Sequence, residues 1–209
     1  MKINLNFKQN RGVFFLCGLL LGIVSILVIR FITYNPHPIH YHANFAVYIN
    51  GQRETFDSPQ YYQEVTACVL TNAITLPTQR AHMHDNINSV VHVHDHAVTW
   101  GQFFENLGWY VGPNYIENQN GTLYEENADN KLHVVLDSQD YTDVSPITNM
   151  VIKDRSRLLI SFGNIDNTTL SAEFKTVPMT AAYYDTHRDP SSCSGSETIT
   201  LSDRLHHLF

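Results

Sequence analysis

The most informative part of this 209-residue chain is residues 80–109, RAHMHDNINSVVHVHDHAVTWGQFFENLGW, which contain five of its twelve histidines. Side chains two residues apart along a β-strand point to the same face of the sheet. The alternation of imidazole and apolar residues therefore predicts two strands that each carry histidines on one face only. On this interpretation His82 and His84 lie opposite Ala81 and Met83, and His92 and His94 lie opposite Val91 and Val93.

An antiparallel pairing of these two strands would gather the four histidines into one patch. The predicted register places His84 opposite His92 and His82 opposite His94, with residues 85–91 as the connection. Neighbouring strands lie about 4.8 Å apart, so the rings would be close neighbours. A shift of one residue would put the two pairs on opposite faces of the sheet. The prediction of a shared site therefore depends on the register.

Clustered imidazoles predict a metal site, because neutral imidazole is a common ligand of divalent Zn and Cu. Asp85 stands beside one pair and could bind the ion or orient a ring, and Asp95 could do the same. The alternative interpretation is a polar strand face in contact with water. The predicted metal-binding residues are His82, His84, His92, His94, His40, His42 and Asp85.

His40 and His42 precede a predicted strand that ends at the hairpin signal Asn50-Gly51. The alternation in this strand places both histidines on the face opposite Phe45, Val47 and Ile49. They are either a third His-x-His arm of the same patch or a polar stalk after the membrane segment.

Residues 98–108 carry helix signals: an N-cap Thr99, a capping-box Gln102 and a terminal Gly108. Further strands are expected at 131–137, at 157–162 and, as one option, at 170–177. Together these elements predict an α+β fold, a β-rich domain that is possibly a β-grasp-like sheet with one packed helix. No His-Glu-x-x-His, Gly-x-Ser-x-Gly or phosphate-loop motif occurs.

Residues 12–29 are an unbroken apolar run, long enough with its flanking residues to cross a bilayer as a helix. Lys2, Lys8 and Arg11 precede the run and Arg30 ends it, which favours an N-terminus inside and a C-terminus outside. No small-residue cleavage site follows, so we expect a signal anchor rather than a cleaved signal peptide. The expected organisation is a cytoplasmic N-terminus (1–11), a transmembrane anchor (12–33), an extracytoplasmic domain (34–188) and a loosely ordered tail (189–209). The protein would thus be single-pass in the plasma membrane.

The expected outer part of the chain is acidic: from residue 36 on it holds nine Lys and Arg against twenty Asp and Glu, a formal charge of 9 − 20 = −11. This charge argues against nucleic acid as a partner and suits attraction of cations. Cys68 and Cys193 are the cysteines of that part. They could form a disulfide outside the cell, or Cys68 could be a soft metal ligand.

The arrangement of residues 39–108 resembles a family of uncharacterised, small, single-pass membrane-anchored proteins of bacteria and archaea. The resemblance rests on the two histidine pairs around Asp85, the pair before Asn50-Gly51, Cys68, and the Thr-x-Gly-x-Phe-Phe sequence from Thr99. Archaeal members have His-x-Glu at the second pair, so His94 departs from that form. The resemblance implies a shared site and implies no activity.

The sequence therefore predicts a membrane-anchored extracytoplasmic protein that binds Cu or Zn through clustered His-x-His strands, for metal handling or sensing. Two alternatives stay open. One is a His-ligated metalloenzyme with an open water position. The other is a cell-surface interaction module without metal, whose histidines make a pH-sensitive face. Protein partners are not predicted.

Overall fold

A computed structural model of the chain describes residues 11–34, 39–62, 76–141, 143–187, 201–206 and 208. Cys68 and Cys193 lie outside these residues. The chain forms two compact units, Met1–His37 with Ser196–Phe209, and Pro38–Gly195. The helices of the larger unit are η1 (Pro59–Tyr61), α3 (Pro77–Arg80), α4 (Trp100–Asn106), η2 (Ile147–Asn149), α5 (Asn167–Thr176) and α6 (Ala181–Tyr184). Its strands are β1 (Tyr41–Ile49), β2 (Gln52–Arg53), β3 (Ala81–His82), β4 (Val90–Val93), β5 (Tyr110–Val111), β6 (Tyr115–Glu117), β7 (Leu123–Glu125), β8 (Lys131–Leu136), β9 (Gln139–Tyr141) and β10 (Arg157–Gly163).

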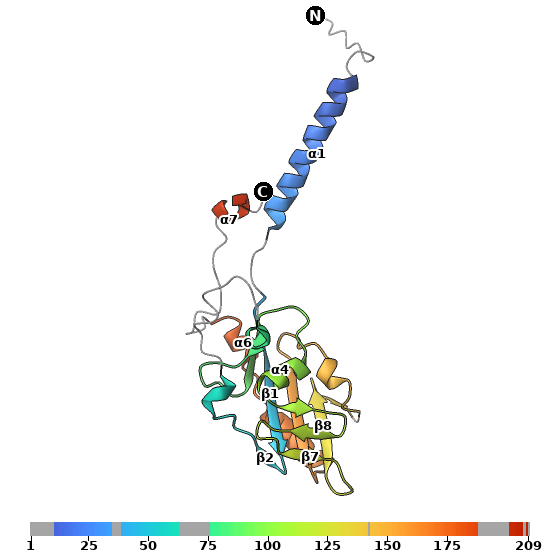
Figure 1. Cartoon of the computed structure of the whole chain (residues 1–209), viewed down its shortest axis with the longest axis vertical. Helices are drawn as coiled ribbons and strands as arrows, with labels where there is room; N and C mark the ends of the chain where they lie inside the picture. The colour runs from blue at the N-terminus through green and yellow to red at the C-terminus, as the bar shows by residue number, and fades with distance from the viewer. Residues whose placement is uncertain are drawn as a thin grey trace, which may run out of the picture. The chain divides into compact units, whose positions relative to one another are not determined.

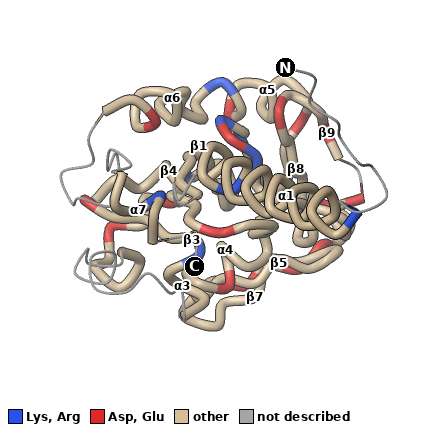
Figure 2. Tube along the Cα trace, turned by 90° about the horizontal axis from the view of Figure 1, so that it is seen from above, with Lys and Arg blue, Asp and Glu red and all other residues tan. Residues whose placement is uncertain are grey.

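The smaller unit contains the apolar helix α1 (Arg11–Thr33) and the short helix α7 (Leu201–His206). No residue of α1 is buried, and the helix is almost free of charged side chains (Figure 2). A guanidinium Nη1 of Arg204 donates to the carbonyl oxygen of Phe31 at 2.6 Å, near the end of α1. Cations stabilise this end of a helix because the last carbonyl groups lack intrahelical partners. The apolar helix expected at residues 12–33 is thus present.

A mixed sheet with strand order β3-β4-β1-β10-β8-β9 forms the centre of the larger unit, with β2 paired to the far end of β1 (Figure 1). Strands β1 and β10 run parallel, and every other pairing in this sheet is antiparallel. A second, three-stranded sheet has the order β5-β6-β7. The structure therefore confirms the α+β class. The turn at Asn50-Gly51, with φ of 51° and 74°, confirms the predicted hairpin.

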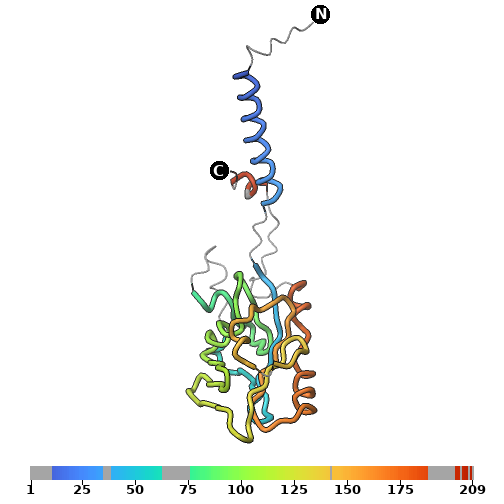
Figure 3. The backbone as a smooth tube through the Cα atoms, turned by 90° about the vertical axis from the view of Figure 1, so that its right-hand side faces the viewer, coloured from blue at the N-terminus to red at the C-terminus, as the bar shows by residue number. Residues whose placement is uncertain are grey.

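The two faces of the central sheet are covered by different elements. Helix α4 and the loops around it cover one face, where Phe45, Val47 and Met83 belong to the main apolar core. Helices α5 and α6 lie on the opposite side of the sheet (Figure 3), where Ala46 and Tyr48 pack in a smaller apolar cluster with α5. The histidines of β1, β3 and β4 belong to this second face. Met83 is fully buried on the other side, as the alternation predicts.

Helix α4 confirms the predicted capping box. The hydroxyl of Thr99 accepts from the backbone N–H of Gln102, and the Gln102 side chain accepts from the backbone N–H of Thr99, both at 3.2 Å. Its apolar stripe of Trp100, Phe103, Phe104 and Leu107 is buried, as expected for a core helix.

The strand expected as one option at 170–177 is wrong, because α5 covers most of this segment as a helix. Asp166 is the N-cap, and its carboxylate accepts from the backbone N–H of Thr169 at 2.7 Å. The helical period then places Leu170 and Glu173 on the buried face, where Ser161 donates to the Glu173 carboxylate at 2.6 Å.

We expect Gly101→Ala to destabilise the larger unit by about 1–3 kcal/mol through overpacking. A Cβ at position 101 would lie 2.5 Å from the backbone oxygen of Thr148, which is not free to move like a side-chain end. An exposed helical Gly→Ala change instead stabilises by about 0.5–1 kcal/mol. Chemical unfolding measures the free energy of unfolding of Gly101→Ala, with Glu105→Ala, at an exposed position of the same helix, as the control. A more stable Gly101→Ala protein would show that the contact with η2 is not tight.

Candidate metal centre

One row of histidines crosses three neighbouring strands. His92 on the central strand β4 pairs with His42 on β1 and with His82 on β3. The predicted register of His84 opposite His92 is wrong by two residues. The loop between β3 and β4 is not the predicted one, because Asp85 and Asn86 adopt positive φ directly after His84. The carbonyl oxygen of Ser89 also accepts from the backbone N–H of Phe45 on β1. A shift of two residues leaves each side chain on its own face, because the side-chain period of a strand is two.

All six histidines of the predicted pairs contact at least one other histidine ring. Centroid distances within the first group are 4.6 Å for His40–His42, 4.4 Å for His42–His92 and 5.9 Å for His40–His92. Other contacts are 5.0 Å for His82–His94, 5.7 Å for His82–His84, 3.6 Å for His84–His92 and 4.5 Å for His40–His94. The third His-x-His arm, at residues 40 and 42, therefore joins the patch and is not a separate stalk.

The cluster is buried, so it is not the solvated strand face of the alternative interpretation. His42, His82, His84 and His92 are each at most 4% exposed, and His40 and His94 are half-buried. Asp85 lies next to His84, and its carboxylate is 2.7 Å from His84 Nδ1. Asp95 instead pairs with Arg80 at 2.7 Å, and His96 is exposed.

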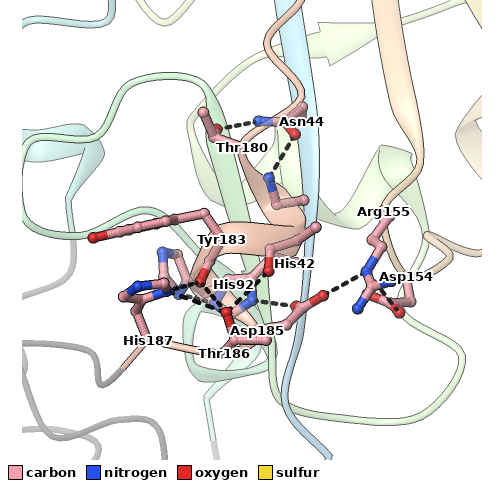
Figure 4. Close-up of polar contacts among 12 residues, drawn as sticks. His42, Asn44, His92, Asp154, Arg155, Thr180, Tyr183, Asp185, Thr186 and His187 are labelled. Atoms are coloured by element: carbon pink, nitrogen blue, oxygen red, sulfur yellow. Dashed lines mark hydrogen bonds and ion pairs between the residues drawn. The ribbon is translucent and has the colours of Figure 1, made fainter.

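Asp185 is a functional candidate that the sequence interpretation missed. Its Oδ1 lies 2.8 Å from His42 Nδ1, and its Oδ2 accepts from Arg155 Nε at 2.7 Å (Figure 4). Arg155 also donates its backbone N–H to the carbonyl of His42 at 2.7 Å. A separation of 143 residues between His42 and Asp185 left no local signal for this contact.

Asn44 explains how Asp185 reaches His42. Asn44 lies two residues after His42 on the same face of β1 and is buried. Its side chain donates to Thr180 Oγ1 and accepts from the backbone N–H of Ala181, both at 2.9 Å (Figure 4). These bonds hold the start of α6 on β1, and Asp185 follows directly after that helix. Tyr184 at the end of α6 lies 5.9 Å from His42 and 6.2 Å from His92 between ring centroids.

Burial lowers the pKa of four histidines of the cluster, His40, His82, His92 and His94. Desolvation, followed by the charges of neighbouring imidazoles, lowers the pKa of His40 to about 3 and of His94 to about 2. Desolvation and the neighbouring His84 lower the pKa of His82 to about 4. Desolvation raises the pKa of Asp185, but its bonds to His42 and Arg155 outweigh this effect and hold the pKa below its usual value. At neutral pH these four imidazoles are thus neutral, and the carboxylate of Asp185 in the same site is ionised.

Two observations favour a bound ion in this cluster. The ring nitrogens of His40, His42 and His92 lie within 4.8 Å of one another, close enough for one ion to bind all three. The buried Nε2 atoms of His40, His82 and His94 have no hydrogen-bond partner among the described residues. A buried polar atom without a partner costs about 1–3 kcal/mol, which coordination to a metal would offset.

Comparison of the chain with models of known protein families, with curated proteins and with solved structures finds no match.

We expect Asp185→Asn to weaken metal binding by about 10–100-fold, the usual effect of losing a carboxylate that orients a ligand histidine. An amide can still bond to His42 but carries no charge to increase the basicity of the ring. Competition with a chromophoric chelator measures the affinity, and Asp129→Asn, in an exposed loop, is the matched control. Equal affinities for both variants would exclude this role of Asp185.

Proposed function

We propose that this protein binds a divalent transition metal, Cu²⁺ or Zn²⁺, at the outer face of a membrane, for metal handling or sensing. The observation that carries the proposal is the set of His40, His42 and His92, whose ring nitrogens gather within 4.8 Å. Three imidazole ligands suit both metals. Among the residues that the structure describes, no other set of His, Cys, Asp or Glu meets this distance.

The surroundings of the three histidines support a preformed metal site. His42 is oriented by Asp185, and His92 is fixed between β1 and β3 by the sheet. The depressed pKa of His40 leaves its ring neutral, so little binding energy is spent on releasing a proton.

The membrane location is the second part of the proposal. Helix α1 has 23 residues, and an 18-residue window within it has a mean hydropathy of 2.8, which allows it to cross a bilayer; a signal sequence has the same properties. At 1.5 Å per residue it spans about 35 Å, against a hydrocarbon core of about 30 Å. The basic residues before the helix favour a cytoplasmic N-terminus. The resemblance to the membrane-anchored His-x-His proteins agrees with this arrangement and is part of the proposal.

Metal analysis of the full-length chain tests the function. The protein would be purified in detergent micelles, stripped with chelator and dialysed against Zn²⁺ or Cu²⁺. We expect at least one tightly bound ion per chain, with no competition from Mg²⁺, which prefers oxygen ligands. Less than one equivalent of both metals would reject the proposal. Protease digestion of intact cells would test the orientation, since an outer domain is cut without lysis.

A further inference from the structure

The six clustered histidines divide into two groups of three, and we propose that the second group, His82, His84 and His94, holds a second metal ion. This inference rests on the proposed function, because the first ion is the one bound by His40, His42 and His92. The protein would then contain a two-metal centre with three imidazoles for each ion.

The sheet itself creates the division. Strand β4 carries His92, which belongs to the first group, and is followed directly by His94, which belongs to the second. The first group is completed by His40 and His42, just before and on β1, and the second by His82 and His84, on and just after β3. Each group therefore combines one complete His-x-His pair with one ring from the β4 segment. The groups are in contact, since the rings of His84 and His92 are 3.6 Å apart and those of His40 and His94 are 4.5 Å apart.

The second group contains nitrogen atoms that the protein leaves available. His82 is 4% exposed, its Nδ1 lies 2.9 Å from the carbonyl oxygen of Thr78, and its Nε2 is buried without a hydrogen-bond partner among the described residues. His94 Nε2 is in the same state, and its ring stacks on that of His82 at 5.0 Å. A carbonyl acceptor fixes the proton of His82 on Nδ1, so Nε2 presents the lone pair that a metal requires.

The two groups also have outer contacts of the same kind. His84 Nδ1 lies 2.7 Å from the carboxylate of Asp85, and His42 Nδ1 lies 2.8 Å from that of Asp185. Each group thus has one ring oriented by an acidic side chain, the common arrangement of metal-binding histidines. The two carboxylates would offset part of the charge of two neighbouring dications. Three protein ligands would leave each ion one position for water or a small bridging anion.

The second ion is expected to bind more weakly than the first. Among the described residues only the first group has its ring nitrogens within 4.8 Å of one another. The imidazole rings of the second group must therefore move further before all three can bind one ion. Titration with Zn²⁺ should therefore show two steps.

The stoichiometry of Zn²⁺ binding tests the inference on the full-length chain in detergent. We expect two ions for the unchanged protein, one for the double variant His82→Ala/His94→Ala, and one for the matched control His40→Ala/His42→Ala. Glutamine at the same positions replaces alanine in either variant that fails to fold by circular dichroism. One ion in the unchanged protein, or two ions in the His82/His94 variant, would overturn the second site and leave the proposed function intact. No ion in the unchanged protein would overturn both.

Discussion

Replacing His92 by alanine is expected to weaken binding at the His40–His42–His92 site by more than about 100-fold. Loss of a residue that only orients a ligand costs about 10–100-fold, so loss of a ligand should cost more. His92 has the largest effect because it lies between His42 and His82 in the sheet, and its Nδ1 is 3.0 Å from His42 Nε2. Its removal leaves the first ion with the two rings of His40 and His42 and takes away the ligand from β4.

Competition titration with Zn²⁺ and a chelator of known affinity measures this effect. His133→Ala is the matched control, because His133 lies on β8, in the same sheet but outside the cluster. Its affinity should equal that of the unchanged protein. His92→Gln, which fills more of the space, separates the loss of a ligand from a packing defect. A folded His92 variant that binds the first ion within threefold of the unchanged protein would contradict the assigned ligand set.

Acidification of the metal-free protein is expected to destabilise the larger unit strongly between pH 6.5 and about 4. The folded-state pKa values of His40, His82 and His94 are about 3, 4 and 2, against 6.5 in the unfolded chain. The unfolded state then binds more protons than the folded state, so the free energy of unfolding falls as the pH falls. This stability is fully present above pH 6.5 and is lost progressively toward the folded-state values, by up to about 1.4 kcal/mol per pH unit for each histidine.

Urea unfolding in the presence of chelator, repeated from pH 7.5 to 4.5, measures the slope. The double variant His82→Gln/His94→Gln should flatten it, because two of the four histidines with a lowered pKa no longer titrate. Stability that is constant or increases on acidification would show that these rings are not buried in the neutral form.

Local sequence patterns predicted the elements that carry the site. The alternation of residues 81–84 and 91–94 correctly separated imidazoles from core residues, because strand side chains alternate whatever the rest of the fold does. The caps of α4 and the turn at Asn50-Gly51 were equally readable, since their signals lie within four residues. At residues 170–177 no such signal was recognised, and the strand expected there as one option was wrong. The segment is part of a helix that begins after the N-cap Asp166.

The register between β3 and β4 lay beyond the local pattern. Pairings that differ by two residues bury the same faces, so hydrophobic alternation does not distinguish them. The observed pairing of His82 with His92 goes with the turn at Asp85-Asn86 and with the hydrogen bond from Phe45 N–H on β1 to the carbonyl oxygen of Ser89. This choice set His92 between His42 and His82 and thereby decided which rings can share an ion.

The sequence by itself predicted that each His-x-His pair at residues 82–84 and 92–94 would lie on one face of a strand, in an α+β protein with an apolar N-terminal helix. It left open whether His40 and His42 join them. The tertiary structure alone decided that α6 docks on β1, that Asp185 rather than Asp95 contacts a cluster histidine, and that β4 is the central strand of the cluster. Side-chain direction along a strand is a local property with a period of two. Strand order and the docking of a helix 140 residues away depend on how the whole chain packs, which no short pattern encodes.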